Sequence, residues 1–112
     1  MATIEQCSAA LEGILGDLAA NPAAKGLDRT LSCRLTDLRQ VVLGRLSDEK
    51  VRDLTVVDDS PSVPRADIRF TMASDDLIAL TEGRLSFGSS WASGRIKLEA
   101  GMRDLLRLRK LL

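Results

Sequence analysis

Hydrophobic residues recur at helical spacing at the start of the chain and alternate with polar residues further along it. Between Thr3 and Ala20 the apolar positions fit one face of a helix, and they are Ile4, Cys7, Leu11, Ile14, Leu15 and Leu18. Thr3 is a candidate N-cap, and Asn21-Pro22 should end the helix because proline has no backbone N–H. This pattern predicts an amphipathic N-terminal helix.

A period of two residues, typical of half-buried strands, follows a short linker. Leu31, Cys33 and Leu35 alternate with Thr30, Ser32, Arg34 and Thr36. Less regular segments run from Gln40 to Leu46 and from Val51 to Val57, and the polar residues 47–50 between them predict a hairpin turn. We therefore expect the first three strands to form an antiparallel meander.

Prolines and serines between Asp58 and Pro64 interrupt the strands. The alternation then resumes at Ile68, Phe70 and Met72, which predicts a fourth strand. Ser74 is a candidate N-cap for a short helix that contains Leu77 and ends at Gly83.

The last third of the chain predicts two more helices and one more strand. A short helix is expected between Leu85 and Ser93, a fifth strand around Ile96 and Leu98, and a final helix from Met102 to Leu112. The expected fold class is α+β: a single domain over residues 1–112, with a mainly antiparallel sheet of about five strands and helices packed on one face. The final helix should dock on the same face as the helix near Leu77.

The apolar residues of the final helix cover an arc of roughly 200°, wider than the ~100° stripe that one core requires. They are Met102, Leu105, Leu106, Leu108, Leu111 and Leu112. Three explanations stay open: the helix also closes an apolar cavity, it is ordinarily packed, or it contacts a second copy of the chain in a homodimer. Its basic residues, Arg103, Arg107, Arg109 and Lys110, leave transient contact with a membrane surface open, although cations also favour a helix C-terminus.

Composition argues against charge-driven partners and against catalysis. The 112 residues are 45% hydrophobic, enough for one core, and 16 Lys and Arg balance 16 Asp and Glu, so no nucleic-acid partner is expected. The absence of histidine removes the commonest general base and metal ligand. The sequence lacks a signal-like N-terminus and a stretch of ~20 apolar residues, so we expect a cytoplasmic protein.

The remaining reactive residue types do not form a recognisable motif. Cys7 and Cys33 lack C-x-x-C spacing and should be reduced and packed as small apolar residues. The carboxylate pairs at 48–49, 58–59 and 75–76 do not have calcium-loop spacing, and the serines at 89, 90 and 93 have no histidine partner. We therefore expect no enzyme activity, no metal site and no cofactor.

Four short runs in the second half follow one another in a recognisable order: Phe70-Thr71-Met72, Asp75 to Leu80, Gly83-Arg84-Leu85 and Gly94 to Leu98. Together with the apolar residues of the final helix, they resemble the sterol carrier protein type two family. The resemblance implies an apolar tunnel between sheet and helices that takes fatty acids, acyl-coenzyme A, sterols or phospholipids. The matched positions that would line it are Met72, Leu77, Leu80, Trp91, Leu105, Leu108 and Leu111.

The sequence departs from the family pattern in three places. Ser86-Phe87 stands where the family often has Asn-Pro, Ser93 stands where relatives often carry glutamine, and Gly101 lies directly before Met102, whereas the family usually places a glycine one residue earlier. Loss of the glutamine puts in doubt a polar contact to a ligand head group, and sterol specificity in particular. The function predicted is a non-catalytic intracellular lipid-binding or lipid-transfer protein. The alternative is an accessory protein-interaction domain with a collapsed cavity that oligomerises through the apolar face of the final helix.

Overall fold

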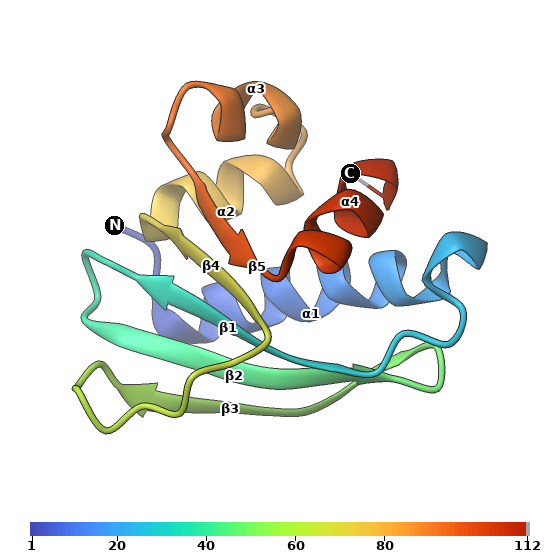
Figure 1. Ribbon diagram of the computed structural model, residues 1–112. Coiled ribbons are helices and arrows are strands. Elements are labelled where there is room, and N and C mark those ends of the chain that lie inside the picture. Colours follow the sequence, from blue (N-terminus) through green and yellow to red (C-terminus); the bar gives the residue numbers. More distant parts are fainter. Residues whose placement is uncertain (112) are drawn as a thin grey trace.

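One five-stranded sheet forms the centre of the structure, and the helices lie over one of its faces (Figure 1). The structure is a computed structural model that describes the backbone of residues 1–111 and the side chains of residues 1–110. Its elements are α1 (Ile4–Ala20), the 3-10 helix η1 (Pro22–Ala24), β1 (Arg29–Leu35), β2 (Gln40–Ser47), β3 (Lys50–Asp58), β4 (Ile68–Met72), α2 (Ser74–Thr81), α3 (Phe87–Ala92), β5 (Lys97–Ala100) and α4 (Met102–Leu111). The predicted α+β class is confirmed.

The strands lie in the order β3-β2-β1-β4-β5. The pairs β1–β2, β2–β3 and β4–β5 are antiparallel, so the predicted meander of the first three strands is confirmed. The central pair β1–β4 is parallel. Asp67 fixes the start of this pair, because one of its carboxylate oxygens accepts hydrogen bonds from both the amide and the hydroxyl of Thr30, each at 3.1 Å. The chain therefore crosses from the sheet edge at β3 to its centre through residues 59–67.

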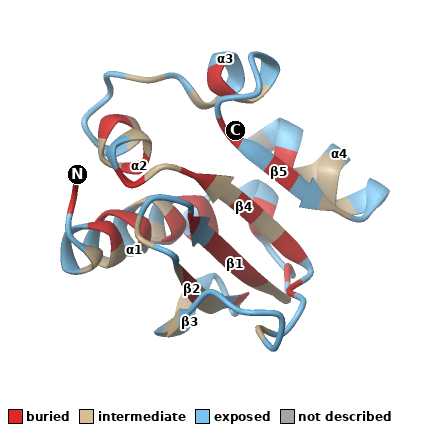
Figure 2. Ribbon diagram, turned by 90° about the vertical axis from the view of Figure 1, so that its left-hand side faces the viewer, coloured by how far each residue is buried: buried red, intermediate tan, exposed pale blue. Residues whose placement is uncertain are grey.

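The sheet has one apolar face, and a row of paired residues across four strands shows it. Val42, Cys33, Phe70 and Leu98 lie side by side from β2 to β5, and all four are buried. They form one core with leucines of α1, α2 and α4, as the buried regions of these elements in Figure 2 indicate. The neighbouring row on the opposite face contains Arg34, Thr71 and Lys97, so that face is polar over β1, β4 and β5, while in β2 the same row continues with the buried Val41.

The residues predicted to begin and end the first helix do so in the structure. The Thr3 hydroxyl accepts the Gln6 N–H at 3.1 Å, and the Gln6 side chain accepts the Thr3 N–H at 2.9 Å. This reciprocal capping box fixes the start of α1. Asn21 ends the helix and then caps η1, because its side chain accepts the Ala23 N–H. Thr3 as N-cap and Asn21-Pro22 as the end of the helix are confirmed.

The prediction that Ser74 caps the next helix is wrong. Ser74 is the first residue of α2 and is fully buried, while Ala73 occupies the N-cap position without a side-chain hydrogen bond. Instead, Asp37 from the β1–β2 turn accepts the Ser74 N–H at 2.8 Å and also the Ser74 hydroxyl. A carboxylate that is distant in sequence thus serves the N-terminus of α2, where the helix dipole favours negative charge.

This contact makes stability depend on pH. Burial alone would raise the pKa of Asp37, but hydrogen bonds from the Ser74 hydroxyl and amide outweigh it and lower the pKa below its ordinary value. The carboxylate therefore stabilises the fold fully above its unfolded-state pKa of about 3.9, and this stabilisation is lost as pH falls through the folded-state pKa.

We expect Asp37→Ala to lower the free energy of unfolding by about 1 kcal/mol at neutral pH, as loss of a helix cap does. Denaturant unfolding at pH 7 and at acid pH should show the difference from wild type shrinking in acid. The control is Asp58→Ala, at an exposed carboxylate that ends β3. A deficit that is the same at both pH values would show that the Asp37 charge contributes nothing.

Candidate functional site

An open groove of about 480 Å³ lies between α3 and α4. Its lining consists of Phe87, Gly88, Trp91 and Ala92 from α3, with Arg109 from α4. The α3 wall is short because the helix has six residues, begins after Ser86 and is followed by Gly94, whose φ of +80° few other residues adopt. The groove is therefore apolar on one side and carries a guanidinium on the other.

Every aromatic residue of the chain contributes to this region, since the sequence has two phenylalanines, one tryptophan and no tyrosine. Phe87 packs edge-on against Phe70 of β4, with ring centroids 6.0 Å apart, and its centroid lies 6.0 Å from that of Trp91. These three rings form the aromatic series, which runs from the buried face of the sheet to the groove. Such pairs stabilise beyond their buried area, so the series positions the α3 wall of the groove in its closed arrangement.

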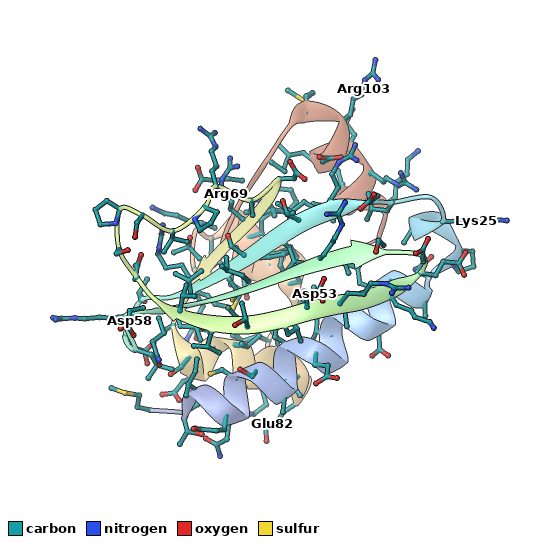
Figure 3. All side chains as sticks on the ribbon, turned by 90° about the horizontal axis from the view of Figure 1, so that it is seen from below. Lys25, Asp53, Asp58, Arg69, Glu82 and Arg103 are labelled. Atoms are coloured by element: carbon teal, nitrogen blue, oxygen red, sulfur yellow. The ribbon has the colours of Figure 1, made fainter. Side chains whose placement is uncertain are left out.

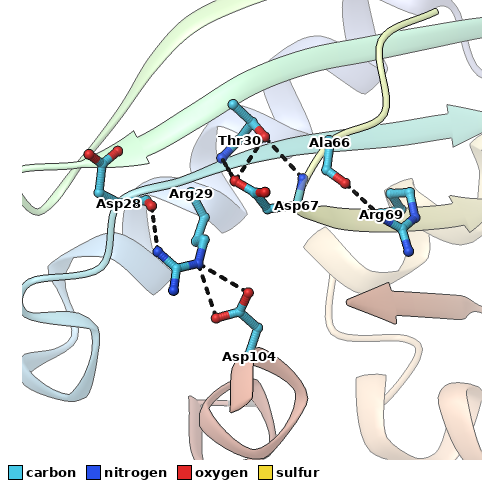
Figure 4. A network of polar contacts seen from close by, with 7 residues as sticks. All are labelled: Asp28, Arg29, Thr30, Ala66, Asp67, Arg69 and Asp104. Carbon is cyan, nitrogen blue, oxygen red and sulfur yellow. Dashed lines mark hydrogen bonds and ion pairs between the residues drawn. The ribbon is translucent and has the colours of Figure 1, made fainter. Parts of the chain in front are cut away.

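The other wall, α4, is held by polar contacts at its inner side. The two carboxylate oxygens of Asp104 accept hydrogen bonds from Arg29 Nε at 3.1 and 3.2 Å, where β1 begins (Figure 4). Arg107 donates to the carbonyl of Ala23 within η1 and to that of Lys25 directly after it. Leu108 is only 1% exposed and belongs to the main core. These contacts leave Arg109 at the groove, where it forms no ion pair with a described carboxylate.

Comparison with known families now identifies the fold. The model of the SCP-2 sterol transfer family matches residues 10–112. The chain belongs to this family. The resemblance seen in the second half of the sequence is confirmed, and the match extends to most of the first half. A search of the curated proteins finds none that matches.

Solved structures share the fold of this SCP-2 family member at low sequence identity. Sterol carrier protein 2 like 2 from Aedes aegypti is 18% identical with a TM-score of 0.64, over 96% of this chain and 97% of that chain. The palmitated form of that protein, solved by NMR, is 18% identical with a TM-score of 0.62, over 98% and 94%. These likenesses show the fold.

A third similar structure belongs to a much longer protein. The stereoselective inverting sec-alkylsulfatase Pisa1 from Pseudomonas sp. is 23% identical with a TM-score of 0.58, over 87% of this chain. The present chain spans 14% of the length of that sulfatase, and 13% of the length of its double mutant. The fold therefore occurs both alone and as a small part of a larger chain.

The residues that the sequence predicted to line the lipid site lie in several different environments of the structure. Trp91 lines the α3–α4 groove. Met72, Leu77 and Leu108 are buried in the core, and Leu80 and Leu105 are partly buried against it. The side chain of Leu111 lies outside the described residues, as does all of Leu112. That these residues line one apolar cavity stays a prediction.

Two groove residues, Phe87 and Arg109, were missed as site residues in the sequence. Phe87 lies one helical turn before Trp91, a spacing that places both on one face of a helix and could have indicated an aromatic wall. Arg109 carried no comparable signal, because only the folded chain brings α4 opposite α3.

A second groove of about 510 Å³ lies between α1 and α2. Small residues of α1, including Ala9 and Gly13, make room for it, and Leu80 and Thr81 of α2 lie on the other side. The only ionisable residue of its lining is Asp17. Because it offers no cation and less apolar surface, we regard the α3–α4 groove as the candidate site.

Both cysteines are buried and free, as the sequence predicts. Burial raises the pKa of Cys33 to about 12, and burial, with the charges of Asp37 and Asp75, raises that of Cys7. The thiols therefore stay protonated and act as small packed groups. Residues that could hold a metal ion do not cluster in the part of the chain that the structure describes, and none of the described helices has the length and apolar content of a membrane span.

The contact between Asp104 and Arg29 should control the mobility of α4. We expect Asp104→Ala to speed hydrogen exchange in the α4 backbone severalfold, because α4 loses its connection to β1 while the rest of the sheet keeps its own contacts. Exchange measured by mass spectrometry should locate the change. The control is Glu12→Ala on the exposed side of α1. Unchanged exchange in α4 would show that Leu108 and Arg107 suffice to hold the helix.

Proposed function

We propose that this SCP-2 family member carries a single-chain lipid of the fatty-acid type, with the anionic head group at Arg109 and the apolar chain along the aromatic series. The observation that carries the proposal is that Phe87 and Trp91 meet the guanidinium of Arg109 at a single groove, and that Phe87 connects this groove to the third aromatic residue, the buried Phe70. Arginine binds carboxylates in a bidentate, charge-assisted manner, while the rings offer a rigid apolar surface.

The comparisons support an acyl ligand. The family is described as a sterol transfer family, and a protein of the same fold has been solved in palmitated form. The groove volume falls within the range of small-molecule sites in proteins, about 300–1,000 Å³. We favour a fatty acid over a sterol because the groove presents a permanent cation to the ligand head group.

We propose that the lipid chain passes between α3 and α4 toward the core. Phe87, Trp91 and Leu105 are all partly buried against that core, and Met72 and Leu108 lie within it. A small separation of α3 from α4 would therefore open a path lined by the residues predicted from the sequence, Met72, Leu77, Leu80, Trp91, Leu105, Leu108 and Leu111. The contacts of α3 with β4, through Phe87, and with the segment just before β5, through the Ser90 carbonyl, which accepts the Ile96 N–H, are few enough to allow this movement.

We also propose that the lipid leaves chemically unchanged. Arg109 is the one ionisable residue in the lining of the groove, and a guanidinium offers hydrogen-bond donors but no acceptor, so its contact with a head group is one of binding. The sulfatase that contains this fold uses a far longer chain. Carriage by shielding apolar surface requires no more than burial, at roughly 25 cal/mol per Å².

The fluorescence of Trp91 tests the site directly. Titrating palmitate into delipidated protein should shift the emission to the blue or change its intensity, because the indole would leave water for an acyl chain. Arg109→Gln should weaken palmitate binding by about tenfold, as loss of a charge-assisted hydrogen bond does. Arg103→Gln, at an exposed cation on the same helix, is the matched control.

If palmitate binds while the emission of Trp91 stays unchanged, the α3–α4 groove is not the binding site. Failure of delipidated protein to bind palmitate, a sterol or a phospholipid would instead favour the alternative of a protein-interaction domain. That alternative has one observation in its favour, the exposed apolar side chains of α4, and it predicts a stable oligomer by sedimentation.

Alanine substitutions at two leucines of α4 should distinguish a residue that packs in the core from a residue that lines the proposed path of the lipid. Leu108→Ala should lower the free energy of unfolding by about 3 kcal/mol, because its fully buried side chain would leave a void. Leu105→Ala should cost less stability and weaken palmitate binding more, since Leu105 is only partly buried. Both variants must be compared without lipid, because bound ligand raises apparent stability. The reverse order of effects would place Leu105 in the core.

A further inference from the structure

Two large apolar side chains of α4 remain in water. Met102 is 73% exposed and Leu106 is 57% exposed, whereas Leu108, on the opposite side of the helix, is 1% exposed. Residues four apart lie one above the other on a helix, so Met102 and Leu106 form a continuous strip, which we name the α4 ridge. The wide apolar arc of this helix is therefore only partly used by the core.

Cations flank the α4 ridge on both sides. At 100° per residue, Arg109 lies on the flank of the ridge next to Met102 in angle but about two turns further along the helix, and Lys110 and Arg103 lie on the opposite flank, next to Leu106. All three are exposed, and Arg103 extends away from the body of the molecule in Figure 3. Asp104, the single acid of α4, instead turns inward to Arg29. The outer face of α4 therefore combines an apolar strip with positive charge and carries no described carboxylate.

This charge is specific to α4 among the described helices. The charged residues of α1 are Glu5, Glu12 and Asp17, and those of α2 are Asp75 and Asp76, while α3 has none. The chain as a whole has no net charge. Although the positive and negative charges of the chain balance, α4 is the one described helix with basic residues, and these surround its exposed apolar side chains.

We propose that the outer face of α4 docks on an anionic lipid bilayer. A helix that lies in the membrane interface needs an apolar strip to enter the acyl boundary and flanking Lys or Arg to bind anionic head groups. Their long aliphatic stems follow the strip while the charges reach the head groups. A nucleic acid would leave the ridge in water, and a protein partner would not by itself require cations on both flanks.

Docking would bring the lipid surface next to the groove, because Arg109 belongs both to a flank of the ridge and to the groove lining. This consequence rests on the proposed function. The docking itself does not, since it uses Met102, Leu106, Arg103 and Lys110, none of which lines the groove.

Flotation with lipid vesicles tests the docking. Delipidated protein is mixed with phosphatidylcholine vesicles that contain phosphatidylglycerol, and separately with pure phosphatidylcholine vesicles. The double variants Met102→Gln/Leu106→Gln and Arg103→Gln/Lys110→Gln should each lower binding to the anionic vesicles by about tenfold or more. The controls are Val56→Gln, at an exposed apolar residue of β3, and Arg39→Gln, at an exposed cation in the turn between β1 and β2.

The proposal predicts binding to anionic vesicles that salt weakens, that both double variants lose and that both controls keep. Equal binding to neutral vesicles, or binding that the double variants retain, would overturn it. A wild-type dimer in sedimentation that Met102→Gln/Leu106→Gln dissociates, without vesicle binding, would also overturn it and assign the ridge to a second copy. Palmitate titration without vesicles reports on the groove alone, and there the ridge variant should bind as wild type does.

Discussion

The unequal coverage of one apolar sheet face governs this structure. The helix α1 is long enough to cover the side of the sheet formed by β2 and β3, and it also packs on α2. The side that ends in β5 has no such helix. The shorter α3 and α4 cover it, and the segment around α3 contains mostly small residues besides Phe87 and Trp91. A sheet covered tightly on one side and loosely on the other leaves a groove on the loose side, which is where the aromatic series and Arg109 meet.

The residues of α4 make several different kinds of contact within one short helix. Leu108 supplies the core, Asp104 and Arg107 bind the start of β1 and the end of η1, and Arg109 faces the groove. These four residues use little more than half of the helix circumference. The remainder contains Met102 and Leu106, whose exposure the core does not explain. The roughly 200° apolar arc is therefore better understood as two surfaces than as one. The inner surface packs against the core, and the outer surface is the one that we propose docks on a lipid bilayer.

Much of the fold could be predicted because its signals are local. The N-cap at Thr3, the alternation around Cys33 and the polar turn at 47–50 depend on neighbours in sequence, and all three appear in the structure. The parallel β1–β4 pair could not be predicted, because alternation shows which face of a strand is buried but not which strand lies beside it. Ser74 illustrates the same limit: a cap looks local, yet the acceptor comes from Asp37 in a distant turn.

The candidate site was predictable only in part for a related reason. The family resemblance placed Trp91 among the residues that would line a lipid tunnel; in the structure Trp91 lines the α3–α4 groove, and that this groove takes the lipid stays a prediction. The pairing of α3 with Arg109, however, exists only after two segments that are separated by β5 fold back on each other. Apart from Trp91, the family resemblance indicated Met72 and a set of leucines, whereas the groove itself is lined by two aromatic residues, two small residues and one cation.

Under the two proposals, the position of Arg109 links lipid uptake to the membrane. Separating α3 from α4 in water would expose the aromatic series, and each Å² of apolar surface exposed costs roughly 25 cal/mol. At a bilayer surface the same rings would meet head groups and acyl chains instead of water, so opening would cost less there. The groove would then stay closed around its lipid in solution and open where α4 is docked. No separate switch is needed, because the change of solvent at one helix face supplies the difference in free energy between the two states.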